Sequence, residues 1–294
     1  MLGRVLTAMV TPFREDGSVD LEAFRRLASH LVQHGSDGIV VTGTTGESPT
    51  LTDDERFALY EAAVDEVGDR ATVVAGTGTY DTRHSVHLTE RAHAIGVDGV
   101  LVVTPYYSKP PQRGIVAHFE AIAAATDRPV IVYNIPGRVV INIEPATIAR
   151  LAEIDNVRAV KQAAQPVDEE AQARNVVQCG LDLYAGDDDL ILPFLRVGGI
   201  GGICVHTHVV GPRVQEQVAA FVAGDETRAA ALDAELRPSI ELLRVTTNPM
   251  AIKHALALLG LCSDRVRLPL VPVDERESAA IRDCLVRLGL DPVG

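Results

Sequence analysis

Reactive side chains in this 294-residue chain stand at the ends of short apolar runs. The most informative is Lys161, in the segment Val157–Ala163, where strand alternation puts it on the same side as Ala159. If that side faces a protein interior, burial disfavours the ammonium and increases the share of neutral amine, which can attack a ketone. The pattern by itself equally allows a strand-end lysine whose ammonium reaches solvent.

Tyr133 and Arg138 belong to the stretch YNIPGR at residues 133–138, which follows the preceding apolar run. A tyrosine on a strand next to Lys161 can relay protons, although a packed aromatic with a satisfied hydroxyl is the alternative. An arginine after Pro-Gly suits bidentate binding of a carboxylate, although it can also be an ordinary surface residue.

Thr44 and Thr45 stand between two glycines in the stretch TGTTGES at residues 42–48. Their hydroxyls and backbone N–H groups could bind a carboxylate, and an ordinary Gly/Thr turn is the alternative. A phosphate-binding loop of the P-loop type is disfavoured because no lysine follows Gly46.

His206 and His208 follow another apolar run and would point the same way on a strand, as a metal-binding pair does. A metal-dependent barrel hydrolase would need further ligands, and Asp187–Asp189 is the only nearby candidate. We therefore expect no metal and keep this hydrolase as the alternative from a different class of enzyme.

Eight apolar runs of four to six residues, rich in Val and Ile, must position these groups, and helix-like segments separate them. This alternation predicts an α/β fold, a (β/α)8 TIM barrel with buried parallel strands. A doubly wound sheet is weaker, because Thr11-Pro12-Phe13 stands where a Gly-rich dinucleotide loop would follow the first strand. The predicted strands are Val5–Val10, Gly38–Val41, Ala71–Ala75, Val100–Val103, Pro129–Val132, Val157–Val160, Leu181–Tyr184 and Gly202–Val205.

Helix signals include an N-cap at Asp20, a capping box of Thr52 with Glu55, and a helix that starts at Asp81 or Thr82 and ends near Gly96. Strand signals stop after about residue 222. We expect a catalytic barrel over residues 1–224 and a C-terminal helical region over residues 225–294. Its predicted helices are Asp225–Arg244, Asn248–Leu259 and Asp274–Leu288.

The composition restricts the partners of the chain. Apolar residues make up 47% and aromatic residues 4%, so the core must be mainly aliphatic, and the net charge of −13 makes nucleic acid and anionic membranes poor partners. Four widely spaced cysteines indicate free thiols in a reducing compartment. No signal segment or membrane span is apparent, so we expect a cytoplasmic protein.

With these motifs assembled, the chain resembles the dihydrodipicolinate synthase family, within the N-acetylneuraminate lyase superfamily. The resemblance runs from Leu6 to about Gly260, and its specific motifs are GTTGES at 43–48 and YNIPGR at 133–138. Gly186-Asp187-Asp188 and Asn248-Pro249 followed by Lys253 are supporting matches.

The resemblance implies that Lys161 forms an imine with pyruvate, while Tyr133, Thr44 and Tyr107 relay protons. It further implies that Tyr107 comes from a neighbouring subunit, so that a dimer or a dimer of dimers is the functional homo-oligomer. The implied activity is condensation of pyruvate with L-aspartate 4-semialdehyde to 4-hydroxy-tetrahydrodipicolinate, in lysine and diaminopimelate biosynthesis, without a cofactor.

The remaining implied roles concern substrate binding. Thr45 binds the pyruvate carboxylate, Arg138 holds the carboxylate of the semialdehyde, the backbone of Ile203 lines the Lys161 pocket, and Gly186 contributes to binding. A 2-keto-3-deoxy sugar acid aldolase of the same superfamily is the nearest alternative, separated mainly by Arg138. A non-catalytic sensor is disfavoured because binding alone does not require a buried amine.

Three departures from the family pattern stand out. Gln162 replaces the usual Glu after the lysine, and the HTH stretch at 206–208 replaces smaller residues. Family members that lysine inhibits offer Asn and Glu at the positions of Tyr80 and His84. We therefore expect weak or absent feedback by lysine.

Overall fold

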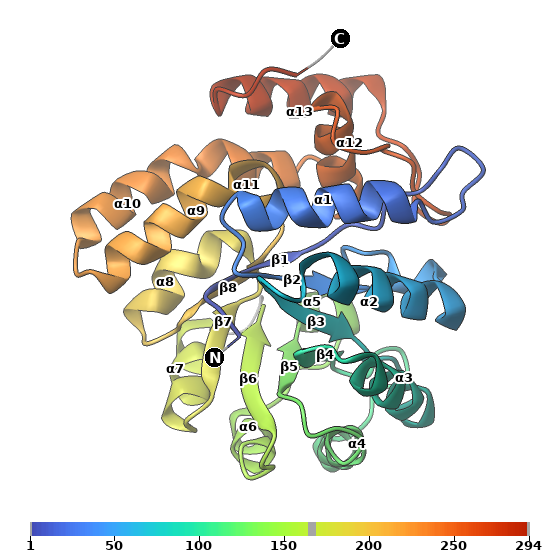
Figure 1. Cartoon of the computed structure of the whole chain (residues 1–294). Helices are drawn as coiled ribbons and strands as arrows, with labels where there is room; N and C mark the ends of the chain where they lie inside the picture. The colour runs from blue at the N-terminus through green and yellow to red at the C-terminus, as the bar shows by residue number, and fades with distance from the viewer. Residues whose placement is uncertain (1, 164–168, 293–294) are drawn as a thin grey trace.

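A closed barrel of parallel strands forms the centre of the molecule, as the computed structural model of residues 2–163 and 169–292 shows (Figure 1). Each strand pairs with the next along the chain, and the last pairs with the first, so the predicted barrel is confirmed. The strands are β1 (Val5–Ala8), β2 (Gly38–Val41), β3 (Thr72–Gly76), β4 (Gly99–Val103), β5 (Val130–Asn134), β6 (Val157–Gln162), β7 (Asp182–Ala185) and β8 (Gly201–Cys204).

Strands β5, β6 and β8 end at other residues than predicted, and candidate site residues lie at these ends. β5 and β6 continue past the predicted ends, Val132 and Val160, and so include Tyr133 and Lys161. β8 ends one residue before the predicted Val205. Apolar runs mark the part of a strand that helices cover, whereas backbone pairing can continue into polar residues at the rim.

Helices surround the barrel, and no helix in the described ranges is long and apolar enough to span a membrane (Figure 1). The predicted caps are confirmed at Asp20, at Thr52 with Glu55, and at Asp81, and the third helix ends at Gly96. The helices of the barrel are α1 (Leu21–Gln33), α2 (Asp53–Val67), α3 (Thr82–Ile95), α4 (Gln112–Ala123), α5 (Pro136–Val139), α6 (Pro145–Leu151), α7 (Glu169–Gln178), α8 (Ile191–Arg196) and α9 (Thr207–Val222).

In the described part of the chain, four more helices follow the barrel: α10 (Glu226–Glu235), α11 (Arg237–Leu243), α12 (Met250–Leu258) and α13 (Glu275–Arg287). The single helix predicted over Asp225–Arg244 is wrong. The chain divides it at Leu236, because Pro238 cannot donate to the preceding turn. Gly224 has a φ of +86° between α9 and α10, at the predicted boundary, but the separation into two domains stays a prediction.

A buried ion pair joins α12 to the barrel. Nζ of Lys253 lies 2.7 Å from Oε1 of Glu47, and both side chains are fully buried. Glu47 follows β2 with a φ of +55°, and its Oε2 accepts the backbone N–H of Arg267. Nζ of Lys253 also donates to the carbonyl of Thr11 after β1. The C-terminal helices are therefore tied to the loops that follow the first two strands.

This tie generates a stability prediction. Lys253→Ala leaves Glu47 buried without its cation, so the free energy of unfolding should fall by about 3–5 kcal/mol. Urea unfolding measures the change, and Lys109→Ala is the matched control because Lys109 is exposed. A loss for Lys253→Ala no larger than that of the control, roughly 0.5 kcal/mol, would contradict the proposed role of the pair.

Candidate active site

A pocket of about 360 Å³ opens at the carboxyl ends of the strands, where barrel enzymes place their active sites. It brings together residues of β5 and β6, residues from the loops after β2, β5 and β7, and residues from the segment that leads into α12. Six of the predicted site residues line it, namely Thr44, Thr45, Tyr133, Arg138, Lys161 and Gly186.

Lys161 lies near the end of β6, and its side chain is only 5% exposed. Burial lowers the pKa of Lys161 to about 8, and the negative charge of Asp188 opposes part of this shift. The neutral share of the amine at neutral pH is therefore well above that of an exposed lysine. The alternative in which this side chain reaches solvent is excluded.

The sequence contains just three lysines, which strengthens the case for Lys161 as the amine of the site. Lys109 is exposed, and Lys253 is held by Glu47. Lys161 is the one of the three that lines the pocket. A keto acid bound in this pocket therefore meets a single candidate side-chain amine.

Tyr133 is the partner of Lys161 in the pairing of β5 with β6. Nζ of Lys161 lies 4.4 Å from the centre of the Tyr133 ring. Burial and the nearby charge of Asp187 raise the pKa of the Tyr133 phenol, so the hydroxyl keeps its proton at neutral pH. The arrangement places a phenol that can donate a proton beside an amine that can act as a nucleophile.

A tight turn after β2 presents Thr44 and Thr45. The N–H of Gly46 donates to the carbonyl of Gly43 at 3.1 Å, and the N–H of Glu47 donates to the carbonyl of Thr44 at 3.1 Å. A Cβ at Gly46 would lie 3.1 Å from the Thr42 backbone, so this close turn favours glycine. The turn holds Thr44 and Thr45 in the wall of the pocket.

Asn248 was predicted only as a supporting match to the family, and the structure places it in the site. Its Nδ2 donates to Oγ1 of Thr45 at 2.9 Å, and Thr247 beside it also lines the pocket. These residues come from the C-terminal region, 203 positions after Thr45. The Asn248-Pro249 motif was the only sequence signal for them.

Gly186 allows β7 to approach β6 closely. A Cβ at this position would lie 2.9 Å from Cβ of Ala163 and 2.9 Å from the carbonyl oxygen of Gln162. The next two residues, Asp187 and Asp188, line the pocket, and burial together with the charge of Asp188 raises the pKa of Asp187. Gly186 therefore sets the distance between these carboxylates and Lys161.

Three predicted site residues differ in their exposure and in whether they line the pocket: Arg138, Tyr107 and Ile203. Arg138 is in the short helix α5 and is exposed where it lines the pocket. Tyr107 is 92% exposed, with a φ of +69°, and Ile203 is fully buried in β8, and neither lines the pocket. The roles predicted for Tyr107 and Ile203 stay predictions.

The expectation that His206 and His208 point the same way on a strand is wrong, because β8 ends at Cys204. His206 precedes α9, and His208 lies in its first turn. Both ring nitrogens of His208 are bound, Nδ1 to the carbonyl of Val205 at 2.7 Å and Nε2 to the N–H of Val10 at 3.2 Å. His208 is therefore not available as a metal ligand.

Gln162 is the departure closest to Lys161. It is fully buried, and its Oε1 accepts from Nδ2 of Asn134 at 3.3 Å, while its Nε2 donates to Oε1 of Gln172 at 3.4 Å. The neutral amide thus has hydrogen-bond partners of its own and adds no charge beside the amine.

A desolvated lysine in a parallel barrel, beside a buried phenol, is the arrangement of lyases that form a Schiff base with a keto acid. A profile of the Dihydrodipicolinate synthetase family matches residues 1–287. The chain belongs to this family.

Individual relatives are similar to this chain over almost its whole length. The 4-hydroxy-tetrahydrodipicolinate synthase of Moorella thermoacetica is 51% identical, over 98% of this chain and 99% of its own. The enzyme of that name from Thermosynechococcus vestitus is 47% identical, over 98% of each chain. The crystal structure of the Cyanidioschyzon merolae enzyme with lysine bound has a TM-score of 0.95 and 40% identity, and covers 98% of this chain and 99% of that one.

The lowered pKa of Lys161 generates a prediction about pH. Imine formation with pyruvate should rise with pH as the amine loses its proton and level off above about 8. Because the charge of Asp188 raises this pKa, Asp188→Asn should move the rising limb to lower pH. The observed rate of imine formation across pH measures both effects.

Asp189→Asn is the matched control, because it removes the same charge from a carboxylate that pairs with Arg244 at 2.6 Å. It should leave the limb close to its wild-type position. A wild-type limb near 10.5, the ordinary value for lysine, would show that Lys161 is not desolvated in the working enzyme.

Proposed function

We propose that this chain condenses pyruvate with L-aspartate 4-semialdehyde to form 4-hydroxy-tetrahydrodipicolinate, a step of lysine and diaminopimelate biosynthesis. The observation that carries the proposal is the buried Lys161 beside Tyr133 in a pocket with Arg138 in its wall. Relatives that are identical to this chain at about half of the aligned positions are named 4-hydroxy-tetrahydrodipicolinate synthase, which supports the same reaction.

The first half of the reaction uses Lys161. Its neutral amine attacks C2 of pyruvate, and the resulting carbinolamine loses water to give an imine. N–H and hydroxyl groups of the turn at Thr44 and Thr45 are suited to the pyruvate carboxylate, and Asn248 orients the Thr45 hydroxyl. Tyr133, together with Thr44, moves protons to and from the forming imine.

The second half joins the two substrates. Loss of a proton from the pyruvate methyl carbon gives an enamine, which attacks the aldehyde carbon and forms the new C–C bond. Arg138 is suited to hold the carboxylate of the semialdehyde, because guanidinium binds carboxylate with two hydrogen bonds. The substrate amino group then attacks the imine carbon, which closes the ring and releases Lys161. Gly186 and the backbone of Ile203 are proposed to shape this pocket.

The relay is proposed to be completed by Tyr107 of a neighbouring subunit in a homo-oligomer, a dimer or a dimer of dimers. Tyr107 projects from its own chain with 92% exposure, and Tyr106 beside it stacks edge-on against Tyr80 at 5.4 Å. A surface on which Tyr80 and Tyr107 are both exposed suits contact with another protein. We also propose that the enzyme works in the cytoplasm, where its four cysteines would stay reduced.

The proposed chemistry is tested by trapping the imine. Borohydride reduction in the presence of pyruvate should attach the three-carbon unit to one peptide, the one that contains Lys161, as read by peptide mass mapping. The adduct should be absent from Lys161→Ala and retained in Lys109→Ala, which removes an exposed amine. An unmodified Lys161 in the wild-type protein would overturn the mechanism.

The acceptor is tested separately. Turnover with L-aspartate 4-semialdehyde is compared with cleavage of 2-keto-3-deoxy sugar acids by the same preparation. Arg138→Lys keeps one positive charge but loses the bidentate fork, so it should raise the KM of the semialdehyde more than that of pyruvate. If the enzyme prefers the sugar acid, its activity is that of a 2-keto-3-deoxy sugar acid aldolase. The imine at Lys161 would still form in that reaction.

Feedback by lysine is predicted to be weak or absent. Nε2 of His84 is engaged with the carboxylate of Asp53 at 2.9 Å, and the exposed Tyr80 offers no amide to an α-amino acid. Initial rates at saturating pyruvate, measured with and without L-lysine, provide the test. Inhibition at sub-millimolar L-lysine would show that other groups bind the effector.

A further inference from the structure

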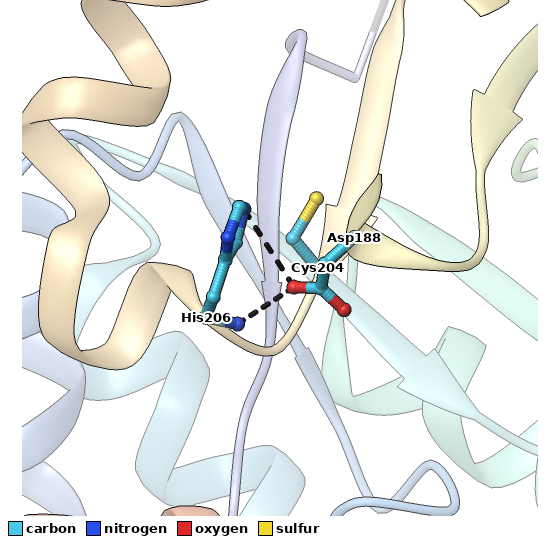
Figure 2. A group of neighbouring side chains, drawn as sticks. All are labelled: Asp188, Cys204 and His206. Atoms are coloured by element: carbon cyan, nitrogen blue, oxygen red, sulfur yellow. Dashed lines mark hydrogen bonds and ion pairs between the residues drawn. The ribbon is translucent and has the colours of Figure 1, made fainter. Parts of the chain in front are cut away.

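At the pocket wall, Asp188, Cys204 and His206 gather in one cluster, in which Cys204 and His206 are buried and Asp188 is partly buried (Figure 2). Asp188 begins the short 3-10 helix η2 (Asp188–Leu190) after β7, Cys204 ends β8, and His206 precedes α9. One ligand atom from each of the three lies within 4.8 Å of the other two. A carboxylate, a thiol and an imidazole thus lie in one place, and the proposed reaction gives no role to the thiol or the imidazole.

The hydrogen bonds of His206 define its tautomer. Oγ of Ser239 donates to the carbonyl of Leu236 at 2.6 Å, so it can only accept from Nδ1 of His206, 3.1 Å away. Nδ1 therefore carries the proton of the neutral ring, and burial lowers the pKa of His206, which favours that neutral form. Nε2 is left with a free lone pair.

That lone pair has no hydrogen-bond partner, although His206 is only 1% exposed. Nε2 lies 3.6 Å from Oδ1 of Asp188, so two acceptors face each other inside the protein (Figure 2). The separation is longer than a hydrogen bond. By contrast, two atoms about 2.0–2.2 Å from a tetrahedral zinc ion lie roughly 3.3–3.6 Å apart.

We propose that Asp188, Cys204 and His206 form a binding site for one divalent cation of the zinc class. A nitrogen, a sulfur and an oxygen ligand together suit zinc and cobalt better than magnesium or calcium. The N–H groups of Val205 and His206, both at 2.7 Å, donate to Oδ1 of Asp188 and orient the carboxylate, so its free lone pairs are those of Oδ2.

The fourth position has room for water. A cavity of about 10 Å³, enough for roughly a single water molecule, adjoins Asp188 and His206. Asp189, Asp233 and Arg237 also line it, so two further carboxylates and one guanidinium border the cavity. Three protein ligands and one water complete a tetrahedral zinc site.

Metal binding is coupled to loss of a proton. Burial raises the pKa of the Cys204 thiol, so the free site holds S–H. When the cation binds, the metal–sulfur bond replaces the S–H bond and one proton leaves to solvent. The site does not depend on the proposed substrates, although Asp188 also lines the pocket and acts on the pKa of Lys161.

The test uses the full chain, stripped with a chelator and titrated with Co²⁺ and Zn²⁺. We expect one equivalent of either ion per chain, by elemental analysis after dialysis, and a thiolate-to-cobalt charge-transfer band. Cys204→Ser should abolish the band, whereas Cys284→Ser, which changes a buried thiol in α13, should retain it. Ser239→Ala, which no longer orients His206, should weaken binding by about 10–100-fold.

Three results would overturn the site. These are no stoichiometric metal, cobalt binding without a thiolate band, or a band that persists in Cys204→Ser. The first would mean that a proton or water occupies the gap between His206 and Asp188. If the Cys204→Ser variant does not fold, the wild-type cobalt spectrum and the Ser239→Ala variant still test the proposal.

Discussion

Closure of the barrel is the constraint on which the rest of the structure depends. β1 pairs with both β2 and β8, so every strand has two neighbours and all eight carboxyl ends meet at one rim. Gly201 allows this closure, because a Cβ there would collide with the carbonyl oxygen of Arg4. Without the closing pair, the groups that follow β2 and β8 would lie at opposite edges of an open sheet.

The reactivity of Lys161 is a balance between burial and charge. Desolvation lowers the pKa of Lys161, and the negative charge of Asp188 raises it in part, so the pKa is about 8. The backbone N–H groups of Val205 and His206 both donate to Oδ1 of Asp188 and hold this carboxylate beside the pocket. A more deeply buried amine without this carboxylate would be more often neutral, and one in water would be almost always charged.

The C-terminal helices do more than cover the barrel. Lys253 neutralises Glu47, the residue that follows the tight turn after β2, and Asn248 bonds Thr45 within that turn. Arg267 adds a backbone N–H to Glu47 and pairs with Glu55 at the start of α2. The turn that carries Thr44 and Thr45 is therefore held from outside the barrel, which couples the stability of the helical region to the geometry of the site.

The sequence by itself determined the alternation of strands and helices, their caps, and the stretches around Thr44, Tyr133 and Lys161. These features depend on neighbours two to four positions apart, so periodicity reveals them. Tertiary structure alone decided that Asn248 reaches Thr45, that His206 lies beyond its strand, and that it joins Cys204 and Asp188. Such contacts arise from barrel closure and burial, and no local pattern records which distant side chains these bring within a few ångströms.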